Sequence, residues 1–491
     1  MKGLGRTAHE IPYSDLRMPE RGPLKERLHF KARLGARTAC DRGVVSFIDI
    51  PRGRGTIMKF HIQTWGCQMN DHDGERLSGL LLKEGFTQVS TADEADLVLL
   101  NTCSIREKAV HKVFSVLGRL REEKKKRDIL IGVTGCLAQQ EQAALFRRAP
   151  HIDFVLGTMA LNQLPRLVEE AKAGKKRVMD TGEYPDNHLF PPEVARRRST
   201  AKALVTIIEG CNHACTYCIV PTTRGVERNR PWQDIVSEVR GVVESGYREV
   251  ELLGQNVNSF NGGCSFAELL ERVSEVEGLE WLRFTTSHPM NFTEELANVL
   301  VTNPKVAPFL HLPVQSGSNA VLRRMLREYT VEQYLERLGY LGEGRAKLGL
   351  STDFIVGFPG ETDEDFEATM DLLETVKFDS SFSFIYSPRP GTAALRLKDD
   401  IPPSVKSGRL QLLQKRQLEL AKESNLRFVG RTVQARIESH SAARDGYWMG
   451  RTGDWKNVHI HAGDGRILPF GELVDVTVTM AGPHYLGAEI A

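Results

Sequence analysis

Apolar and polar residues alternate on two length scales between residues 58 and 176. Short apolar runs typical of buried strands are each followed by a longer stretch in which apolar residues recur with helical spacing. The strand-like runs are residues 59–67, 96–103, 129–136 and 154–157. Because strands that alternate with helices favour a parallel sheet, this region is predicted to be an α/β domain whose helices cover a parallel sheet.

The alternation restarts at residue 199 and continues to residue 426. The strand-like runs are residues 203–210, 249–256, 281–287, 309–314, 350–358 and 381–387. Since no antiparallel signal interrupts them and they are too few for an eightfold barrel, a partial (β/α)6 barrel is predicted. One helical stretch begins with the capping-box pattern from Thr362 to Asp365. Residues 177–198 lack any period and are rich in Pro and charge, which indicates a linker.

Residues 427–491 contain short alternating runs separated by Gly and Asp. This pattern predicts a small all-β barrel of the size that binds oligonucleotides. The candidates for stacking on bases and pairing with phosphates are Tyr447, Trp448, Arg451, Trp455 and Lys456. The alternative interpretation places part of these aromatic side chains in the barrel core.

The leader, residues 1–57, has neither a helical nor an alternating period. We expect it to be a non-structural extension, with a targeting segment as the alternative. Twelve Lys or Arg against six Asp or Glu give the leader a charge of +6, which leaves the rest near −4 although the whole chain is +2. The basic surplus therefore gives no argument for a nucleic-acid partner.

Length and cysteine usage narrow the class of protein. A chain of 491 residues is expected to form about three domains. No apolar run approaches the roughly 20 residues that span a bilayer, so we expect a soluble protein without membrane contact. The eight scattered cysteines fit a reducing compartment rather than a secreted disulfide framework, which predicts a cytoplasmic location.

A first triad of cysteines occupies one repeated position in the first region. Cys67, Cys103 and Cys136 each end one of the first three predicted strands. Because the C-terminal ends of parallel strands lie along one edge, these thiols are expected to converge there. An iron–sulfur cluster on three thiolates is the favoured interpretation. A zinc site with a fourth ligand and three semi-buried core cysteines are the alternatives.

A second triad, Cys211, Cys215 and Cys218, follows the first predicted strand of the second region with Cys-x3-Cys-x2-Cys spacing. Zinc takes four ligands, and no fourth Cys or His with finger spacing follows, although His213 lies inside the loop. A cubane on three thiolates leaves one iron open for the amino and carboxylate groups of S-adenosylmethionine. Zinc and a redox dithiol are the less favoured alternatives.

The stretch CNHACTYC resembles the cluster loop of radical S-adenosylmethionine enzymes. The order of the regions resembles the methylthiotransferases, which combine an N-terminal domain with an auxiliary [4Fe–4S] cluster, a radical barrel and a C-terminal TRAM barrel that grips RNA. Within that family, the motifs similar to those of the tRNA-2-methylthio-N6-dimethylallyladenosine synthases are WGCQMNDHDGER, NTCSIREKA, GCLAQ, CIVPTTRGVERNRP and HLPVQSGS. The resemblance covers residues 58–491, although GRTGDWKNVHI is longer than usual for a TRAM barrel.

The resemblance implies transfer of a methylthio group to C2 of N6-dimethylallyl (isopentenyl) adenosine next to the anticodon, at position 37 of tRNA. It implies an auxiliary [4Fe–4S] cluster on the first triad and a second [4Fe–4S] cluster, on the second triad, that binds and cleaves S-adenosylmethionine. The partner is then tRNA, with flavodoxin or ferredoxin as the electron donor and an unidentified sulfur donor. We expect a monomer.

Residues at the other strand ends of the predicted barrel are candidates for contacts with S-adenosylmethionine, with a structural loop role as the alternative. They are Gln255, Asn256, Ser287, Gln315, Ser316, Gly357 and Gly360. His288 and His311 are expected to form structural hydrogen bonds rather than to carry protons, and Arg224 and Arg230 are candidates for pairing with phosphate or carboxylate. The remaining thiols, Cys40 and Cys264, match no motif.

Three alternative functions are compatible with these motifs. Within the methylthiotransferases, the other substrates are threonylcarbamoyl-adenosine in tRNA and a ribosomal-protein aspartate. From a different class, the alternative is a non-catalytic RNA-binding protein in which zinc on both triads stabilises the fold.

Overall fold

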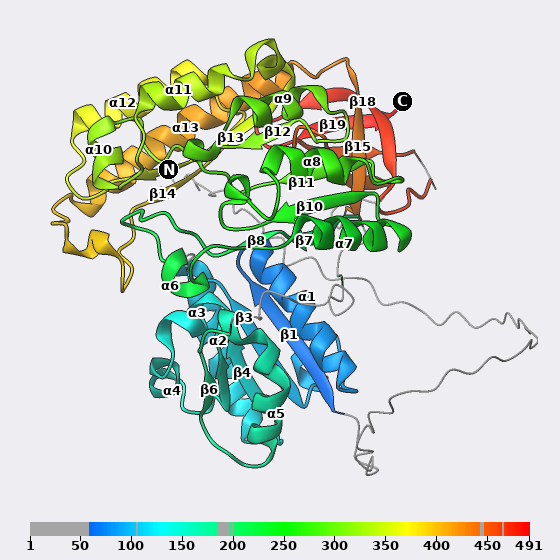
Figure 1. Ribbon diagram of the computed structural model, residues 1–491, viewed down its shortest axis with the longest axis vertical. Coiled ribbons are helices and arrows are strands. Elements are labelled where there is room, and N and C mark those ends of the chain that lie inside the picture. The colour runs from blue at the N-terminus through cyan, green and yellow to red at the C-terminus, as the bar shows by residue number, and fades with distance from the viewer. Residues whose placement is uncertain (1–57, 105–106, 185–196, 198–200, 442–445, 464–465) are drawn as a thin grey trace, which may run out of the picture.

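The computed structural model describes residues 58–491 except 105–106, 185–196, 198–200, 442–445 and 464–465. In Figure 1 the N-terminal sheet, in blue and cyan, lies below the central barrel, and the C-terminal strands, in red, lie beside it. The extension predicted at residues 1–57 lies outside the described residues. Within the described part of the chain, no helix is both long and apolar enough to cross a membrane.

The N-terminal region forms a parallel sheet in the order β2-β1-β3-β4-β5-β6. Its strands are β1 (Lys59–Trp65), β2 (Thr87–Gln88), β3 (Leu97–Thr102), β4 (Leu130–Thr134), β5 (Phe154–Leu156) and β6 (Val178–Asp180). Its helices are α1 (Gln68–Lys83), α2 (Glu107–Lys124), α3 (Cys136–Glu141), α4 (Ala144–Arg148) and α5 (Leu164–Lys172). The central strand β3 is buried at every position, as expected for a strand covered on both faces.

This sheet extends further along the chain than the sequence indicated. The edge strand β6 lies inside residues 177–198, which were expected to be a linker, and it pairs in parallel with β5. A run of so few residues shows no period, so this strand is visible only through its pairing. The following residues 185–196 lie outside the described residues.

The second region contains the parallel strands that the sequence predicted, arranged as the sheets β11-β10-β7 and β12-β13-β14. These strands are β7 (Ala203–Thr206), β10 (Glu249–Leu253), β11 (Trp281–Phe284), β12 (Phe309–His311), β13 (Gly349–Val356) and β14 (Ser380–Ile385). The helices are α6 (Val220–Arg224), α7 (Trp232–Glu244), α8 (Phe266–Ser274), α9 (Glu294–Thr302), α10 (Asn319–Arg324), α11 (Val331–Gly339), α12 (Asp363–Val376) and α13 (Pro403–Leu426). A parallel bridge between Leu282 and Val306 leads from β11 towards β12.

Two local features of this barrel concern its loops. The predicted capping box is confirmed, because the Thr362 hydroxyl accepts from Asp365 N and the Asp365 carboxylate accepts from Thr362 N. An antiparallel pair that the sequence did not predict, β8 (Ile208–Glu209) with β9 (Arg228–Asn229), frames the loop of the second triad. Strands of two residues give no alternating signal, so the prediction of a purely parallel arrangement was wrong here.

The C-terminal region is a closed barrel in the order β15-β16-β17-β19-β18. Its strands are β15 (Thr432–His440), β16 (Tyr447–Thr452), β17 (Asn457–His461), β18 (Leu473–Ala481) and β19 (Leu486–Ile490). Alternate residues such as Val458, Ile460 and Val476 face one apolar core. The predicted fold class, an α/β sheet domain followed by a partial (β/α)6 barrel and a small β-barrel, is therefore confirmed.

Several candidates for RNA contact in this small barrel are used inside the protein. Trp448 belongs to the barrel core. Lys456 is buried, and its Nζ lies 3.0 Å from Asp379 Oδ1 in the central barrel. Arg451 Nε lies 2.9 Å from Glu438 Oε1. The expectation of RNA contact is wrong for Trp448 and Lys456, because tertiary packing removes both from the surface.

Trp455 lies in the β16–β17 hairpin, the stretch that is longer than usual. Its ring stacks on Phe309 at the start of β12, with centroids 5.1 Å apart, and the Arg283 guanidinium carbon lies 4.9 Å from its centroid. Trp455 has a φ of 73°, a left-handed conformation that is uncommon for such a side chain. The hairpin is thus docked at the N-terminal ends of the barrel strands.

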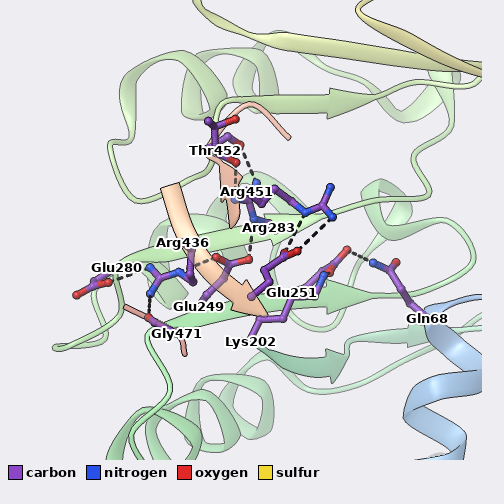
Figure 2. A network of polar contacts seen from close by, with 12 residues as sticks. Gln68, Lys202, Glu249, Glu251, Glu280, Arg283, Arg436, Arg451, Thr452 and Gly471 are labelled. Atoms are coloured by element: carbon purple, nitrogen blue, oxygen red, sulfur yellow. Dashed lines mark hydrogen bonds and ion pairs between the residues drawn. The ribbon is translucent and has the colours of Figure 1, made fainter. Parts of the chain in front are cut away.

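Two buried glutamates on β10 join the three regions, and Figure 2 shows the network. Glu249 accepts hydrogen bonds of 2.8 Å from Arg283 Nε of β11 and from Arg436 Nε of β15. Arg436 also lies 2.8 Å from Glu280 Oε2. The C-terminal barrel is therefore attached to the central barrel through a desolvated ion pair.

Glu251 makes the corresponding connection to the N-terminal region. It accepts a 2.6 Å hydrogen bond from Gln68 Nε2, in the first turn of α1, and it pairs with Lys202. The Gln68 amide oxygen accepts in turn from the Thr285 hydroxyl over 3.2 Å. The residue that follows Cys67 is thereby anchored inside the central barrel.

We predict that Arg436→Met lowers the free energy of unfolding by about 3–5 kcal/mol, because it leaves the buried Glu249 carboxylate without one of its partners. Urea unfolding followed by tryptophan fluorescence measures the change. Arg416→Met is the control, since it breaks an exposed ion pair with Glu374 and is expected to change the midpoint little. Equal losses in the two variants would contradict the assignment of Arg436 as an interdomain anchor.

Candidate active site

The first triad lies at one edge of the N-terminal sheet. The strands β1, β3 and β4 are neighbours, and Cys103 N donates to Trp65 O over 2.9 Å, which holds the ends of β1 and β3 together. Cys67 precedes α1, Cys103 follows β3, and Cys136 is the first residue of α3. Each cysteine therefore stands where its parallel strand ends, along the edge at which α/β folds build their sites.

Two glycines permit the close approach of these strand ends. Gly135 has a φ of 90°, and a Cβ there would lie 2.5 Å from the carbonyl oxygen of Thr102. At Gly66 a Cβ would lie 2.7 Å from the Cβ of Cys103. Only glycine has both the conformation and the space for these positions.

The thiols of the first triad differ in their environment. Cys103 and Cys136 are buried, whereas Cys67 is exposed. Desolvation by the surrounding protein raises the pKa of the Cys67 thiol, and the neighbouring Cys136 thiol raises it further. The Arg224 guanidinium lowers it. Because Arg224 belongs to the central barrel, positive charge from that barrel acts on the first triad.

The second triad lies in the loop between β8 and β9. Cys211 N donates to Gly225 O over 3.2 Å, which joins the two ends of the loop, and Cys218 N donates to Cys215 O over 3.0 Å, which forms a tight turn inside it. Arg327 Nη1 lies 3.4 Å from Cys215 Sγ. The buried guanidinium of Arg327 therefore contacts one of the thiols. The sequence pattern gave no reason to select this arginine.

The thiols of this loop are mutually coupled. Burial raises the pKa of the Cys218 thiol to about 12, and the neighbouring Cys215 and Cys211 thiols raise it as well. Burial also raises the pKa of Cys211, whereas the Arg327 charge lowers the pKa of both. Ligation requires thiolates, so these thiols must lose protons when cations bind.

Polar atoms without a partner gather at two of the predicted strand ends. The buried atoms without a hydrogen-bond partner in the described structure include three at the ends of β10 and β11: Asn256 Oδ1, Ser287 Oγ and His288 Nε2. Asn256 itself is held by a 3.1 Å hydrogen bond from its Nδ2 to Asn291 Oδ1. Buried polar atoms normally find partners, so these atoms at the ends of β10 and β11 are available to a polar ligand.

The remaining strand-end candidates have structural contacts. Gln255 Oε1 accepts from Gly210 N over 2.5 Å, which ties it to the start of the second-triad loop. Ser316 Oγ accepts from Ser318 N over 3.2 Å. Gly357 N donates to Glu361 Oε1 over 2.9 Å.

Two further candidates are defined by their backbone. Gln315, with a φ of 75°, forms a parallel bridge with Phe354. Gly360 adopts a φ of 77°. Both positions therefore shape the turns at the strand ends through their backbone conformation.

The two histidines make the structural hydrogen bonds that were expected. His288 Nδ1 accepts from Met290 N over 3.3 Å, and burial lowers its pKa far below the usual value, which keeps the ring neutral. Its ring stacks on His213, with centroids 3.8 Å apart. His311 Nδ1 lies 2.7 Å from the Ser351 hydroxyl.

The two arginine candidates, by contrast, are buried in ion pairs within the protein. Arg224 Nη2 lies 2.6 Å from Asp73 Oδ2 of α1, and Arg230 Nη1 lies 2.8 Å from Glu238 Oε2 of α7. Because both guanidinium groups are buried in these ion pairs, neither is free to pair with a substrate phosphate or carboxylate, and that hypothesis is wrong. Asp73 is 151 residues from Arg224 and Glu238 is eight residues from Arg230, and the spacing of the chain alone identified neither pair.

The polar face of α1 connects the two triads. Beside the Arg224–Asp73 pair, Arg76 Nη1 lies 2.7 Å from Glu209 Oε1, two residues before Cys211. These side chains are buried, so the start of α1 that follows Cys67 is docked on the base of the second-triad loop. The charged stretch after Cys67 was the only sequence signal for this contact.

The donor sets agree with iron–sulfur chemistry. Each triad offers three cysteine sulfurs, the ligands that Fe–S clusters take. Asn256 Oδ1 and Ser287 Oγ supply hydrogen-bonding capacity that a polar cofactor at the strand ends would use.

Comparisons with known proteins agree with this geometry. The family described as uncharacterized protein family UPF0004 matches residues 59–157, and the radical SAM superfamily matches residues 205–373. A protein of Anaeromyxobacter sp. (strain K) called tRNA-2-methylthio-N(6)-dimethylallyladenosine synthase is 46% identical over 88% of this chain and 94% of its own length. Its namesake in Myxococcus xanthus (strain DK1622) is 45% identical over 88% of this chain and 94% of its own length.

Among solved structures, the radical S-adenosylmethionine methyltransferase TsrM from Kitasatospora setae superposes with a TM-score of 0.54 at 17% identity, over 69% of this chain and 77% of that chain. This likeness concerns the fold alone. The barrel and its three-cysteine loop define a radical S-adenosylmethionine enzyme. The chain belongs to the family of tRNA-2-methylthio-N(6)-dimethylallyladenosine synthases.

We predict that Gly135→Ala lowers the free energy of unfolding of the metal-free protein by about 1–3 kcal/mol, because an alanine would be strained at this φ and would press on Thr102 O. Chemical denaturation measures the change. Gly118→Ala is the control, because a Cβ there meets nothing within 4 Å inside helix α2, and it is expected to be neutral or stabilising. Unchanged stability in Gly135→Ala would show that the strand ends are less closely packed than described.

Proposed function

We propose that this protein transfers a methylthio group to C2 of N6-dimethylallyl (isopentenyl) adenosine next to the anticodon, at position 37 of tRNA. The observation that carries the proposal is the pair of three-cysteine sets, the first at three parallel strand ends and the second in the β8–β9 loop, with α1 docked between them. The relatives that are 45–46% identical carry the name of this activity. A radical generator alone would need only the second triad.

The proposal assigns one [4Fe–4S] cluster to each triad. The first triad would hold the auxiliary cluster, and the second triad would hold the cluster that binds S-adenosylmethionine. When bound, these groups supply the radical that removes a hydrogen atom from the adenine carbon and the sulfur that replaces it. Asn256 and Ser287 are the residues best placed to bind the cofactor, because their buried oxygen atoms lack a protein partner.

The contributions of the protein itself are positioning and charge. The Arg224–Asp73 and Arg76–Glu209 pairs fix the first triad relative to the second. The guanidinium of Arg327 beside Cys215 offsets part of the negative charge that three thiolates bring. Geometry fixed in this way is what two reactions on one base require, because a small displacement of either site is costly to the rate.

The substrate and partners follow from the same proposal. The C-terminal barrel is of the size that binds oligonucleotides, and Tyr447, which packs against His461 at its surface, remains the aromatic candidate for RNA. We further propose a cytoplasmic monomer that receives electrons from a flavodoxin or ferredoxin. The sulfur donor is left open.

Nucleoside mass spectrometry of tRNA from a strain that lacks the gene tests the activity. We expect the methylthio derivative of isopentenyladenosine to disappear while isopentenyladenosine accumulates. Loss of a methylthio derivative of threonylcarbamoyl-adenosine, or of a modified ribosomal-protein aspartate, would instead favour the corresponding substrate. A colourless protein that contains zinc after anaerobic purification would contradict the enzyme proposal altogether.

We predict that Cys103→Ala retains formation of 5′-deoxyadenosine but stops methylthio transfer, whereas Cys215→Ala abolishes both. The reason is that the proposal gives each triad its own task. Chromatography of both products measures the difference, and each variant should lose about four of roughly eight irons per chain.

Cys264→Ala is the matched control for these variants. This thiol is buried in the apolar core of the central barrel and belongs to neither triad, so iron content and both products should persist. Equal loss of both products in Cys103→Ala, in a protein that keeps its second set of irons, would contradict separate roles for the triads.

A further inference from the structure

Part of the inner surface of the central barrel is occupied by the chain itself. On β10, Val250 and Leu252 belong to the apolar core shared with the helices, so Glu249, Glu251 and Leu253 face the inner side of the sheet. As Figure 2 shows, the side chains that cover this face come from the two neighbouring regions and, with Lys202 and Arg283, from the central barrel itself. The inward-facing side chains of β10 are therefore already in contact with other parts of the chain.

The first turn of α1 provides part of this cover. Gln68 donates to Glu251 over 2.6 Å, and Met69 forms a small apolar cluster with Leu204 and Leu253. All three apolar members of this cluster are buried. The same helix turn that follows Cys67 thus occupies the space in front of β7 and β10.

The inner face of the other sheet is covered by Trp455 at the start of β12 but is exposed along β14. Along β14, Ile385 packs against the core that includes Leu413 and Leu420 of α13, so the alternate residues Phe382 and Phe384 face inward. These two phenylalanines are 53% and 49% exposed. Two adjacent aromatic side chains that are half exposed on a barrel wall form a surface that can bind an apolar group.

A polar group lies next to this aromatic pair. The His311 ring contacts Phe382 edge-on, with centroids 6.1 Å apart. His311 Nε2 lies 3.6 Å from Asp353 Oδ1, and Asp353 stands opposite Phe382 in the β13–β14 register. One face therefore presents an apolar surface beside two polar side chains that can bond to a ligand.

This face leads directly to the second triad. Tyr386, two residues beyond Phe384, contacts Phe358 with ring centroids 5.0 Å apart. Phe358 contacts Tyr217, the residue before Cys218, at 6.4 Å between centroids. A continuous row of aromatic rings therefore leads from the end of β14 to the loop at which the proposed reaction begins.

We propose that the inner face of β12, β13 and β14 is the subsite for a dimethylallyl-substituted adenine, and this subsite rests on the proposed function. Phe382 and Phe384 contact the dimethylallyl group, while His311 and Asp353 face the polar edge of the base. A base that undergoes chemistry leaves the RNA stack and needs both kinds of contact. The inward-facing residues of β10, by contrast, are covered by Gln68 and Met69 of α1 and by Arg436.

The test compares the binding of two anticodon stem-loop RNAs that differ only in carrying dimethylallyladenosine or adenosine at the modified position. Dissociation constants are measured by fluorescence anisotropy on the holoenzyme and on two variants, Phe382→Ala and Phe384→Ala. For the holoenzyme we expect tighter binding of the dimethylallyl RNA. Each variant should bind that RNA about tenfold more weakly and bind the adenosine RNA almost unchanged.

Two controls separate this effect from a general loss of structure. Leu412→Ala removes an apolar side chain of α13 that is 58% exposed and lies outside β12–β14, and it should preserve the preference between the two RNAs. Phe384→Leu keeps an apolar surface and should recover most of the preference. If Phe382→Ala loses iron, Phe384→Ala still decides, because Phe384 makes no ring contact with His311 in the described structure.

The outcomes distinguish the subsite from the function. If the holoenzyme prefers the dimethylallyl RNA and both alanine variants keep that preference, the subsite is elsewhere and the proposal is overturned. If the variants weaken both RNAs equally, the two phenylalanines contact a feature common to both RNAs, and the proposal is again overturned. If the holoenzyme neither prefers nor modifies the dimethylallyl RNA, the proposed function itself is overturned, and the subsite with it.

Discussion

The arrangement of the three regions depends on two carboxylates buried on one strand. Glu249 and Glu251 lie on the inner face of β10, and a carboxylate at that depth is stable only when cations or donors surround it. Each region contributes a partner: Arg283 and Lys202 belong to the central barrel, Arg436 to the C-terminal barrel and Gln68 to the N-terminal region. Each glutamate has a partner from outside its own sheet. The buried negative charges on β10 therefore have all their partners only when both neighbouring regions are docked.

This constraint reaches the chemistry through Gln68. That residue follows Cys67 directly, so the hydrogen bond to Glu251 fixes the backbone of the first triad against the barrel. The buried pair between Arg224 and Asp73 acts in the same direction from the second-triad side. Buried polar contacts, which are specific in geometry, therefore fix how the two triads lie relative to each other, together with the apolar contact of Met69 with Leu204 and Leu253.

The same docking explains how the barrel selects where a substrate lies. Open (β/α) barrels present their strand ends as a general site, and the likeness to TsrM reflects that shared scaffold. In this chain the first turn of α1 and the hairpin that carries Trp455 occupy one part of the barrel. The face with Phe382 and Phe384 remains open. Neighbouring regions thus shape specificity by covering surface as well as by offering contacts.

The sequence by itself determined the strand–helix alternation, the partial barrel and the location of both triads, because periodicity is local and parallel strands end along one edge. It did not determine which charges pair. Arg224 and Lys456 were considered for external partners, yet both are buried against Asp73 and Asp379. Only the tertiary structure decided these roles and the short strand β6. The physical reason is that the energy of a buried charge depends on residues far away in the chain, which no local pattern contains.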